Sequence, residues 1–102
     1  MSDPRAVAQI VPVARALATW RVRHGLTANQ AEVLVHVFDR GTVTGSELAH
    51  LVGITTASMT RLLAVLERDG WVHRHPDPQD GRRVVVRPSK QCVRALDDLR
   101  IG

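Results

Sequence analysis

The segment from Thr44 to Arg87 constrains the fold more than any other part of this 102-residue chain. It reads TGSELAHLVGITTASMTRLLAVLERDGWVHRHPDPQDGRRVVVR. Residues that can cap a helix stand before two runs with apolar residues at helical spacing, and a glycine follows each run. Two β-prone runs then flank a loop rich in proline, aspartate and glycine. The pattern predicts a short helix, a tight turn, a longer helix and a two-stranded hairpin.

The short helix is expected to begin at Thr44-Gly45-Ser46-Glu47, a capping box in which the side chains of the first and last residue close the first turn. Gly53 can adopt a positive φ in the turn that follows, and Ile54 can pack its side chain into the core. Three apolar residues of this helix are predicted to face inward: Leu48, Leu51 and Val52.

The longer helix, which we call the reader helix, is expected to be capped by Thr55, to run to about Asp69 and to end at Gly70. Its apolar residues fall on one face at a spacing near 3.6: Met59, Leu62, Leu63 and Leu66. The opposite face is mostly small and cationic: Ala57, Ser58, Arg61, Ala64, Val65 and Arg68. Such a helix buries one side and presents the other.

The hairpin is expected to pair Trp71–His75 with Arg82–Arg87 around the turn-forming loop Pro76–Gly81. Thr42-Val43 is short and β-prone, which suits a small strand pairing with the hairpin. Ser89 can cap a last helix from Lys90 to about Arg100. That helix is predicted to turn Cys92 or Val93, Leu96 and Leu99 inward.

Two helices are predicted before this segment. Asp3-Pro4 is a good start for a first helix that runs to about Arg23 and stops at Gly25. Pro12 predicts a kink or a new start, and the apolar surface is wide enough for two partners, one of them another subunit. A capping box at Thr27–Gln30 begins the second helix, which ends at Gly41. Its inward stripe is Ala31, Leu34, Val37 and Phe38.

Composition limits the classes of function. The length fits one domain, and thirteen of the fourteen basic residues are arginine, with a formal net charge of +4. Basic character suits a polyanion such as DNA, although compositional drift explains it equally well. One cysteine excludes an intramolecular disulfide, and the absence of a long apolar run or a secretory leader leads us to expect a cytoplasmic protein without a membrane partner.

A helix-turn-helix followed by a charged hairpin, or wing, predicts binding to double-stranded DNA, because the second helix fits the major groove. The fold class we expect is mainly α with a small β-hairpin, a winged helix-turn-helix. An arginine on a protruding hairpin can enter a narrow minor groove. The candidate DNA-binding residues are Thr55, Thr56, Ser58, Arg61 and Arg68 on the reader helix and Asp80, Arg82 and Arg83 on the wing. Taken singly, each feature also fits a solvated helix face or a solubilising hairpin.

Two blocks carry a family resemblance: LTANQAEVLVHV, and TGSELAHLVGITTASMTRLLAVLERDGWVHRHPDPQDGRRVVVRPS. They resemble the winged-helix core of the MarR (multiple antibiotic resistance regulator) family from about Leu26 to Ser89, including the wing pattern Asp-Pro-x-Asp-x-Arg. The resemblance implies a dimeric bacterial or archaeal transcription factor, usually a repressor and often responsive to a small effector. It also implies that Thr56–Asp69 reads DNA, that Arg82 enters the minor groove and that Asp80 orients it.

Few residues follow Ser89, whereas family members usually finish with long helices that pair across the dimer. We therefore divide the chain into a dimerisation helix at 1–25, a winged-helix core at 26–88 and a short C-terminal helix at 89–102. We expect a homodimer through the N-terminal helix. The rival reading is a winged helix used as a protein-interaction module that partners or antagonises another regulator.

Other reactive residues carry less weight. Cys92 could be a redox sensor, but a small buried hydrophobe is the favoured reading. His73 and His75 share one side of a strand without a third ligand nearby, so no metal or cofactor is expected. Glu67 and Arg74 are expected to pair where the reader helix meets the wing. The sequence shows no nucleophile–base pattern or phosphate loop, so we expect a protein that is not an enzyme.

Overall fold

The computed structural model describes residues 15–99. Residues 15–23 form an N-terminal helical segment that leads into a turn at residues 24–25. The elements that follow are α2 (Ala28–Arg40), β1 (Val43–Thr44), α3 (Gly45–Val52), α4 (Thr56–Arg68), β2 (Val72–Pro76), β3 (Val84–Pro88) and α5 (Lys90–Asp97). The predicted cap at Asp3-Pro4 and the kink at Pro12 lie outside the described residues. The predicted fold class, mainly helical with a winged helix-turn-helix, is confirmed.

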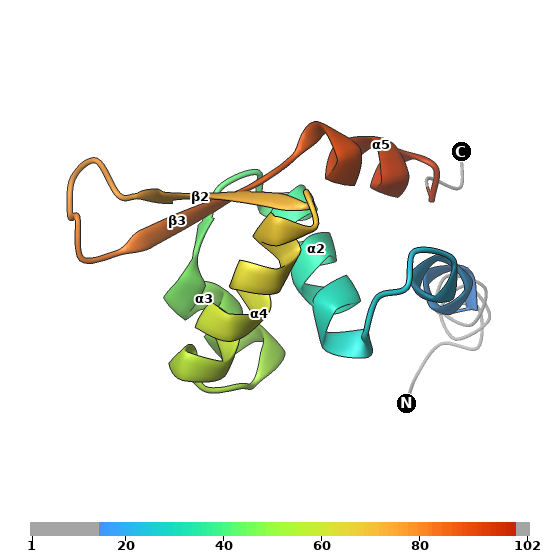
Figure 1. Cartoon of the computed structure of the whole chain (residues 1–102), viewed down its shortest axis with the longest axis horizontal. Coiled ribbons are helices and arrows are strands. Elements are labelled where there is room, and N and C mark those ends of the chain that lie inside the picture. The colour runs from blue at the N-terminus through green and yellow to red at the C-terminus, as the bar shows by residue number, and fades with distance from the viewer. Residues whose placement is uncertain (1–14, 100–102) are drawn as a thin grey trace, which may run out of the picture.

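The sheet stands to one side of the helices, and its long hairpin extends well beyond them (Figure 1). Its strand order is β1-β3-β2, with both pairs antiparallel. Val43 pairs with Val86 and Thr44 with Val85, so the small extra strand predicted at Thr42-Val43 forms one residue later. β2 and β3 pair from Val72 opposite Pro88 to Pro76 opposite Val84. The N-terminal helical segment and α5 lie at the end of the molecule away from the wing tip (Figure 1).

Side-chain caps define where the helices begin. Thr27 and Gln30 form the complete predicted box, with Gln30 N donating to Thr27 Oγ1 at 3.1 Å and Thr27 N donating to Gln30 Oε1 at 2.9 Å. The box predicted at Thr44 forms only in part. Glu47 N donates to Thr44 Oγ1 at 3.1 Å, but the Glu47 carboxylate accepts from the Thr44 hydroxyl at 3.0 Å. Thr44 is also the last residue of β1, so its backbone belongs to a strand as well as to a cap.

The core lies between α2, α3, α4 and the sheet. Its largest fully buried side chains include Leu34, Leu48, Met59 and Leu66. Val52, Ile54 and Leu62, predicted to face inward, are half-buried and pack against this core, and Leu51 is half-buried as well. Val33, Ala49 and Ala95 are buried in addition, because α2 is covered by α3, α5 and β3 rather than on one side only.

The wing differs from the prediction at its tip. Arg82 and Arg83 were expected to begin the second strand, but β3 begins at Val84. Arg83 N donates to Asp80 O at 3.0 Å, and Asp77 N donates to Arg83 O at 2.9 Å. These two bonds fold both arginines into the loop. Within the described part of the chain no single helix is long and apolar enough to cross a membrane; α3 and α4 pass such a test only as a pair bent by 108°.

Candidate nucleic-acid interface

The outer face of α4 is fixed by the turn that precedes it and by its buried side. Gly53 adopts a left-handed φ of 78°, which ends α3 and redirects the chain, and the Thr55 hydroxyl accepts the Ser58 amide at 3.0 Å. Met59, Leu63 and Leu66 are buried against the core. The exposed residues of the helix are therefore held at a defined angle to the wing: Thr56, Ala57, Thr60, Arg61, Ala64 and Arg68.

Thr60 belongs to this exposed face, and sequence reasoning missed it. It lies one turn after Thr56, and its hydroxyl donates to the Thr56 carbonyl at 2.9 Å. Four residues advance a helix by 400°, which stacks the two threonines on the side of α4 that faces the wing. The pair of hydroxyls at this spacing was the signal that could have found it.

Ser58 was predicted to face outward near Arg61, and the structure places it half-buried. The Thr55 hydroxyl donates to Ser58 Oγ at 2.9 Å, and Arg61 Nη2 donates to the same oxygen at 3.4 Å. Arg68 is exposed, but its Nε lies 3.1 Å from Asp69 Oδ1, which offsets part of its charge. Arg61 is thus the cation that the middle of the helix presents.

At the wing tip two arginines contact the carboxylate of Asp80. Arg82 donates to Asp80 Oδ1 through its backbone N at 3.1 Å and its Nε at 3.2 Å. Arg83 Nε lies 3.7 Å from Asp80 Oδ2. The bonds from Arg82 and the nearby charge of Arg83 lower the pKa of Asp80, so it stays ionised. The Arg82 side chain is 93% exposed and remains free to meet a ligand.

Glu67 and Arg74 clamp the base of the wing to the end of α4, as predicted. Glu67 accepts from the Arg74 backbone N at 3.0 Å, from Nε at 3.2 Å and from Nη2 at 3.0 Å. The side-chain hydrogen bonds from Arg74 are the main cause of the lowered pKa of Glu67, and the backbone hydrogen bond adds to it. Both guanidinium donors share Glu67 Oε1 while the backbone N uses Oε2, so the three bonds fix the orientation of the carboxylate as well as its distance.

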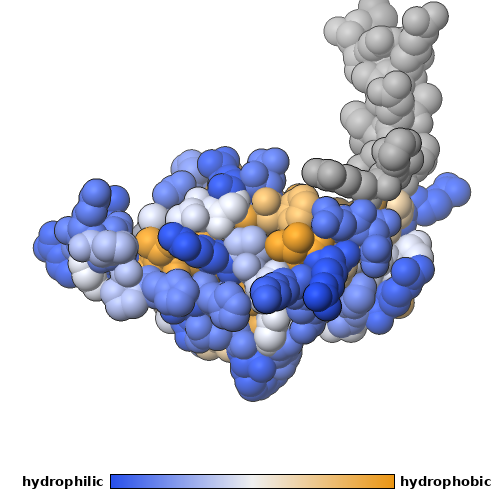
Figure 2. Space-filling model, turned by 90° about the horizontal axis from the view of Figure 1, so that it is seen from above, coloured by the Kyte–Doolittle hydropathy of each residue, from blue (hydrophilic) through white to orange (hydrophobic). Residues whose placement is uncertain are grey.

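A cleft of about 210 Å³ separates α4 from the wing. Its polar lining includes Ser46 from α3, Thr56 and Thr60 from α4, and Arg74, Arg82 and Arg83 from the wing. Hydrophilic residues also cover the wing tip when the molecule is seen from above (Figure 2). The reader helix and the wing therefore share one cleft, in which polar and cationic side chains lie beside the apolar side chains of Met59, Leu63 and Val84.

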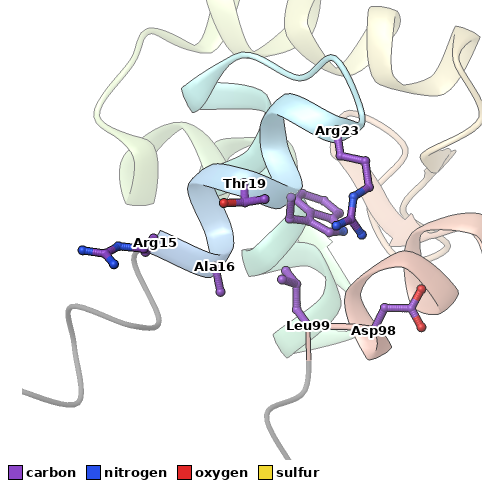
Figure 3. A pocket seen from close by; sticks show the side chains of 7 residues that line it. Arg15, Ala16, Thr19, Arg23, Asp98 and Leu99 are labelled. Carbon is purple, nitrogen blue, oxygen red and sulfur yellow. The ribbon is translucent and has the colours of Figure 1, made fainter.

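The remaining candidates lie elsewhere. Cys92 is fully buried, and burial raises the pKa of its thiol to about 11. The rings of His73 and His75 are 6.4 Å apart, and no group of three metal-ligating residues occurs in the described ranges. A cavity of about 490 Å³ lies between the N-terminal helical segment and the end of α5, lined by Thr19, Trp20 and Leu99 among others (Figure 3).

The comparisons with known proteins agree with this geometry. The MarR family model matches residues 26–84. A transcriptional regulator of the helix-turn-helix type from Bacillus subtilis, YcgE, is 39% identical over 61 residues, which cover 60% of this chain and 40% of that protein. The match thus spans less than half of that relative's length.

Two solved structures are similar over most of the chain. A mutant of MarR from E. coli complexed with operator DNA superposes with a TM-score of 0.73 at 26% identity, covering 93% of this chain and 69% of that one. The transcriptional regulator Tm0710 from Thermotoga maritima superposes with a TM-score of 0.82 at 25% identity, covering 93% and 68%. The family model covers more than half of the sequence, and its region contains α2 to α4 and most of the wing. The chain therefore belongs to the MarR family, whose members are transcription regulators and not enzymes.

Proposed function

We propose that this chain is a sequence-specific, double-stranded DNA-binding regulator of transcription. The observation that carries the proposal is an exposed helix face combined with a projecting wing: Arg61 is exposed on α4, while Arg82, held by Asp80 at the wing tip, lines the same cleft as Thr56 and Thr60 of α4. A helix fits the major groove, and an arginine on a projecting hairpin fits the minor groove beside it. The similarity to a regulator solved with operator DNA supports this reading.

In the proposed complex α4 lies in the major groove. Arg61 forks onto a guanine edge, which is worth about 1–3 kcal/mol of discrimination against a wrong base. Thr55, Thr56 and Thr60 approach the groove from the first two turns. Arg82, with Arg83 beside it, reaches the adjoining minor groove, where arginine is attracted by the negative potential.

The protein is further proposed to act as a homodimer and a repressor on a two-fold operator. The N-terminal helical segment and α5 lie away from the wing tip, so a partner at that end leaves both reading surfaces free (Figure 1). Two copies of α4 would then enter successive major grooves, roughly 34–36 Å apart. The cavity beside Trp20 is the proposed place for a small effector, at the junction of the dimerisation end and the core.

The test begins with a duplex selected by the wild-type protein from a randomised library. Replacing Arg82 with alanine should weaken binding to it by about 1–3 kcal/mol, because a desolvated groove contact is lost. Lys90, which is exposed at the start of α5, serves as the control, and Lys90→Ala should do much less. Binding is measured by fluorescence anisotropy over a series of salt concentrations.

Affinity for the selected duplex should fall steeply with salt, because cations that contact phosphates displace counterions. Unchanged affinity in the Arg82 variant would overturn the wing assignment. A protein that sediments as a monomer and shows no salt-dependent DNA affinity would instead favour the protein-interaction module.

A further inference from the structure

Ser58 stands on the first turn of α4, but its hydroxyl oxygen is already engaged within the protein. It accepts from the Thr55 hydroxyl at 2.9 Å and from Arg61 Nη2 at 3.4 Å. Two hydrogen bonds fill the acceptor positions of a hydroxyl oxygen. With both acceptor positions engaged, Ser58 could contact DNA only by donating its own O–H while these contacts stand.

The position of Ser58 on the helix leads to the same conclusion. Three residues advance a helix by 300°, so Ser58 lies about 60° around the axis from Arg61. Ser58 is half-buried, whereas Arg61 is exposed and borders the hollow that faces the start of α2. Ser58 therefore lies beside the Arg61 side chain and not on the most exposed side of the helix.

We propose that Ser58 is a positioning residue for Arg61, which it holds over the first turn of α4 before DNA arrives. The inference rests on the proposed function and refines it: Arg61 reads the base, and Ser58 acts through Arg61. The chain Thr55–Ser58–Arg61 then links the helix cap to the reading group.

The physical reason is pre-organisation. A free arginine side chain has many rotamers and loses that freedom when a base fixes it. An acceptor on the preceding turn removes part of the freedom in the unbound protein, so less is lost on binding. Only Nη2 is used by Ser58, and the other guanidinium donors remain available for the two acceptors of a guanine edge.

The substitution Ser58→Ala isolates this role. The Thr55 hydroxyl accepts from the backbone N of residue 58, which alanine retains, so the cap of α4 is kept. Ser58→Thr restores the hydroxyl. Both variants should match the wild-type protein in far-UV circular dichroism and closely in melting temperature, which makes the affinities comparable.

A double-mutant cycle on the duplex selected by the wild-type protein tests the proposal. Ser58→Ala should weaken binding about 3- to 10-fold, and Ser58→Thr should recover most of the loss. In an Arg61→Ala background, measured at low salt so that phosphate contacts keep binding detectable, Ser58→Ala should have no further effect. Coupling of this kind distinguishes positioning from direct contact.

A second measurement needs no DNA. NMR relaxation of the Arg61 Nε–H group in the free protein should show a higher order parameter in the wild-type protein and in Ser58→Thr than in Ser58→Ala. Equal order parameters in all three would overturn the proposal. So would an unchanged affinity in Ser58→Ala, or an equal loss in both Arg61 backgrounds, because the second result would show that Ser58 touches DNA itself.

Failure of the proposed function gives a different result. A wild-type protein that selects no sequence from the library would overturn sequence-specific DNA binding, and this inference with it. A selected sequence together with additive effects at positions 58 and 61 would leave DNA binding standing and remove only the role given to Ser58.

Discussion

Cys92 is the single thiol of the chain, and its surroundings determine its chemistry. It is fully buried on α5, and desolvation raises the pKa of the thiol to about 11. The thiolate is the reactive form, so the folded protein holds almost none of it at neutral pH. We expect iodoacetamide to modify Cys92 slowly at pH 7.5 and quickly in urea, as measured by mass spectrometry.

The same shift predicts a pH dependence of stability. The folded-state pKa of Cys92 is raised above its usual value of 9.0, so the neutral thiol favours the folded state. This contribution is complete below about pH 9 and is lost as the pH rises toward 11. Rapid labelling of the native protein at pH 7.5 would contradict both the burial and the pH dependence.

Glu67 contributes to stability with the opposite pH dependence. Its pKa is lowered by the bonds from Arg74, so the ionised form favours the folded state above pH 4.5, and this contribution is lost as the pH falls through the lowered value. We expect Glu67→Gln to cost about 1 kcal/mol of unfolding free energy at pH 7 and less at acid pH. Urea titrations at several pH values test this.

The control for Glu67 is Asp39→Asn, an exposed carboxylate at the end of α2. It should change the unfolding free energy little at either pH. A Glu67→Gln variant that matches the wild-type protein in unfolding free energy at every pH would show that the Arg74 contact contributes nothing.

Two residues mark the limit of what the sequence predicts at this scale. A helical wheel of α4 separates Met59 and Leu63 from Arg61 correctly, because spacing alone decides which residues share a face. It cannot show that Ser58 Oγ accepts from two neighbours or that Thr60 faces the cleft beside the wing. Those facts depend on side-chain rotamers and on where the next element packs.

The turn between α3 and α4 sets the angle of the reader helix. Gly53 has a φ of 78°, and a Cβ at this position would meet no atom within 4 Å. Gly53→Ala should therefore cost only the backbone penalty of the left-handed conformation, about 1–2 kcal/mol. The midpoint of urea unfolding gives the measurement.

Gly81 in the wing loop is the matched control, because it is equally open but does not have a positive φ. Gly81→Ala should be neutral or slightly stabilising, since alanine restricts the unfolded chain. Equal costs at the two positions would show that the conformation at Gly53 is not what matters.

At the scale of elements the sequence predicts where helices begin better than where the second strand of the hairpin begins. Thr27, Thr55 and Ser89 each cap the expected helix, because a hydroxyl before an apolar-periodic run has one clear use. The boundary of β3 was two residues off. Hydrogen bonds to Asp80 O and from Asp77 N hold Arg83 in the loop. A run of β-prone residues in the sequence does not reveal such hydrogen bonds.

Across the whole molecule, Trp20 joins the first and last described helices. Its buried Nε1 donates to Ala95 O at 2.9 Å, and its ring lies 6.0 Å from that of Trp71. Trp20→Phe keeps an aromatic ring but leaves a buried carbonyl without its donor. We expect a loss of about 1–3 kcal/mol in unfolding free energy, measured by urea denaturation.

Val22 on the same helical segment is the control, because its side chain is 69% exposed. Val22→Ala should change stability by less than about 0.5 kcal/mol. A Trp20→Phe variant as stable as the Val22 variant would show that the N-terminal helical segment is held by other contacts.

The winged-helix core was predictable as a whole because capping, periodicity and turn residues agree along residues 26–88. The packing of the N-terminal helical segment against α5 could not be predicted. The wide apolar surface predicted for the first helix indicated two partners. That Trp20 meets α5 and Trp71 could only be seen in three dimensions, because these residues are far apart in sequence.

Ser89 closes the wing at its root. Its hydroxyl donates to Gly70 O at 2.6 Å, its backbone N donates to Trp71 O at 3.1 Å, and its Oγ accepts the Cys92 amide at 3.1 Å. The chain therefore leaves the body at Gly70 and returns at Ser89, and the hydrogen bonds of Ser89 hold these two points together. In a hairpin anchored in this way, one residue pair added or removed where β2 and β3 meet the loop should keep the register of the pairs nearer the root and change how far the loop with Arg82 projects.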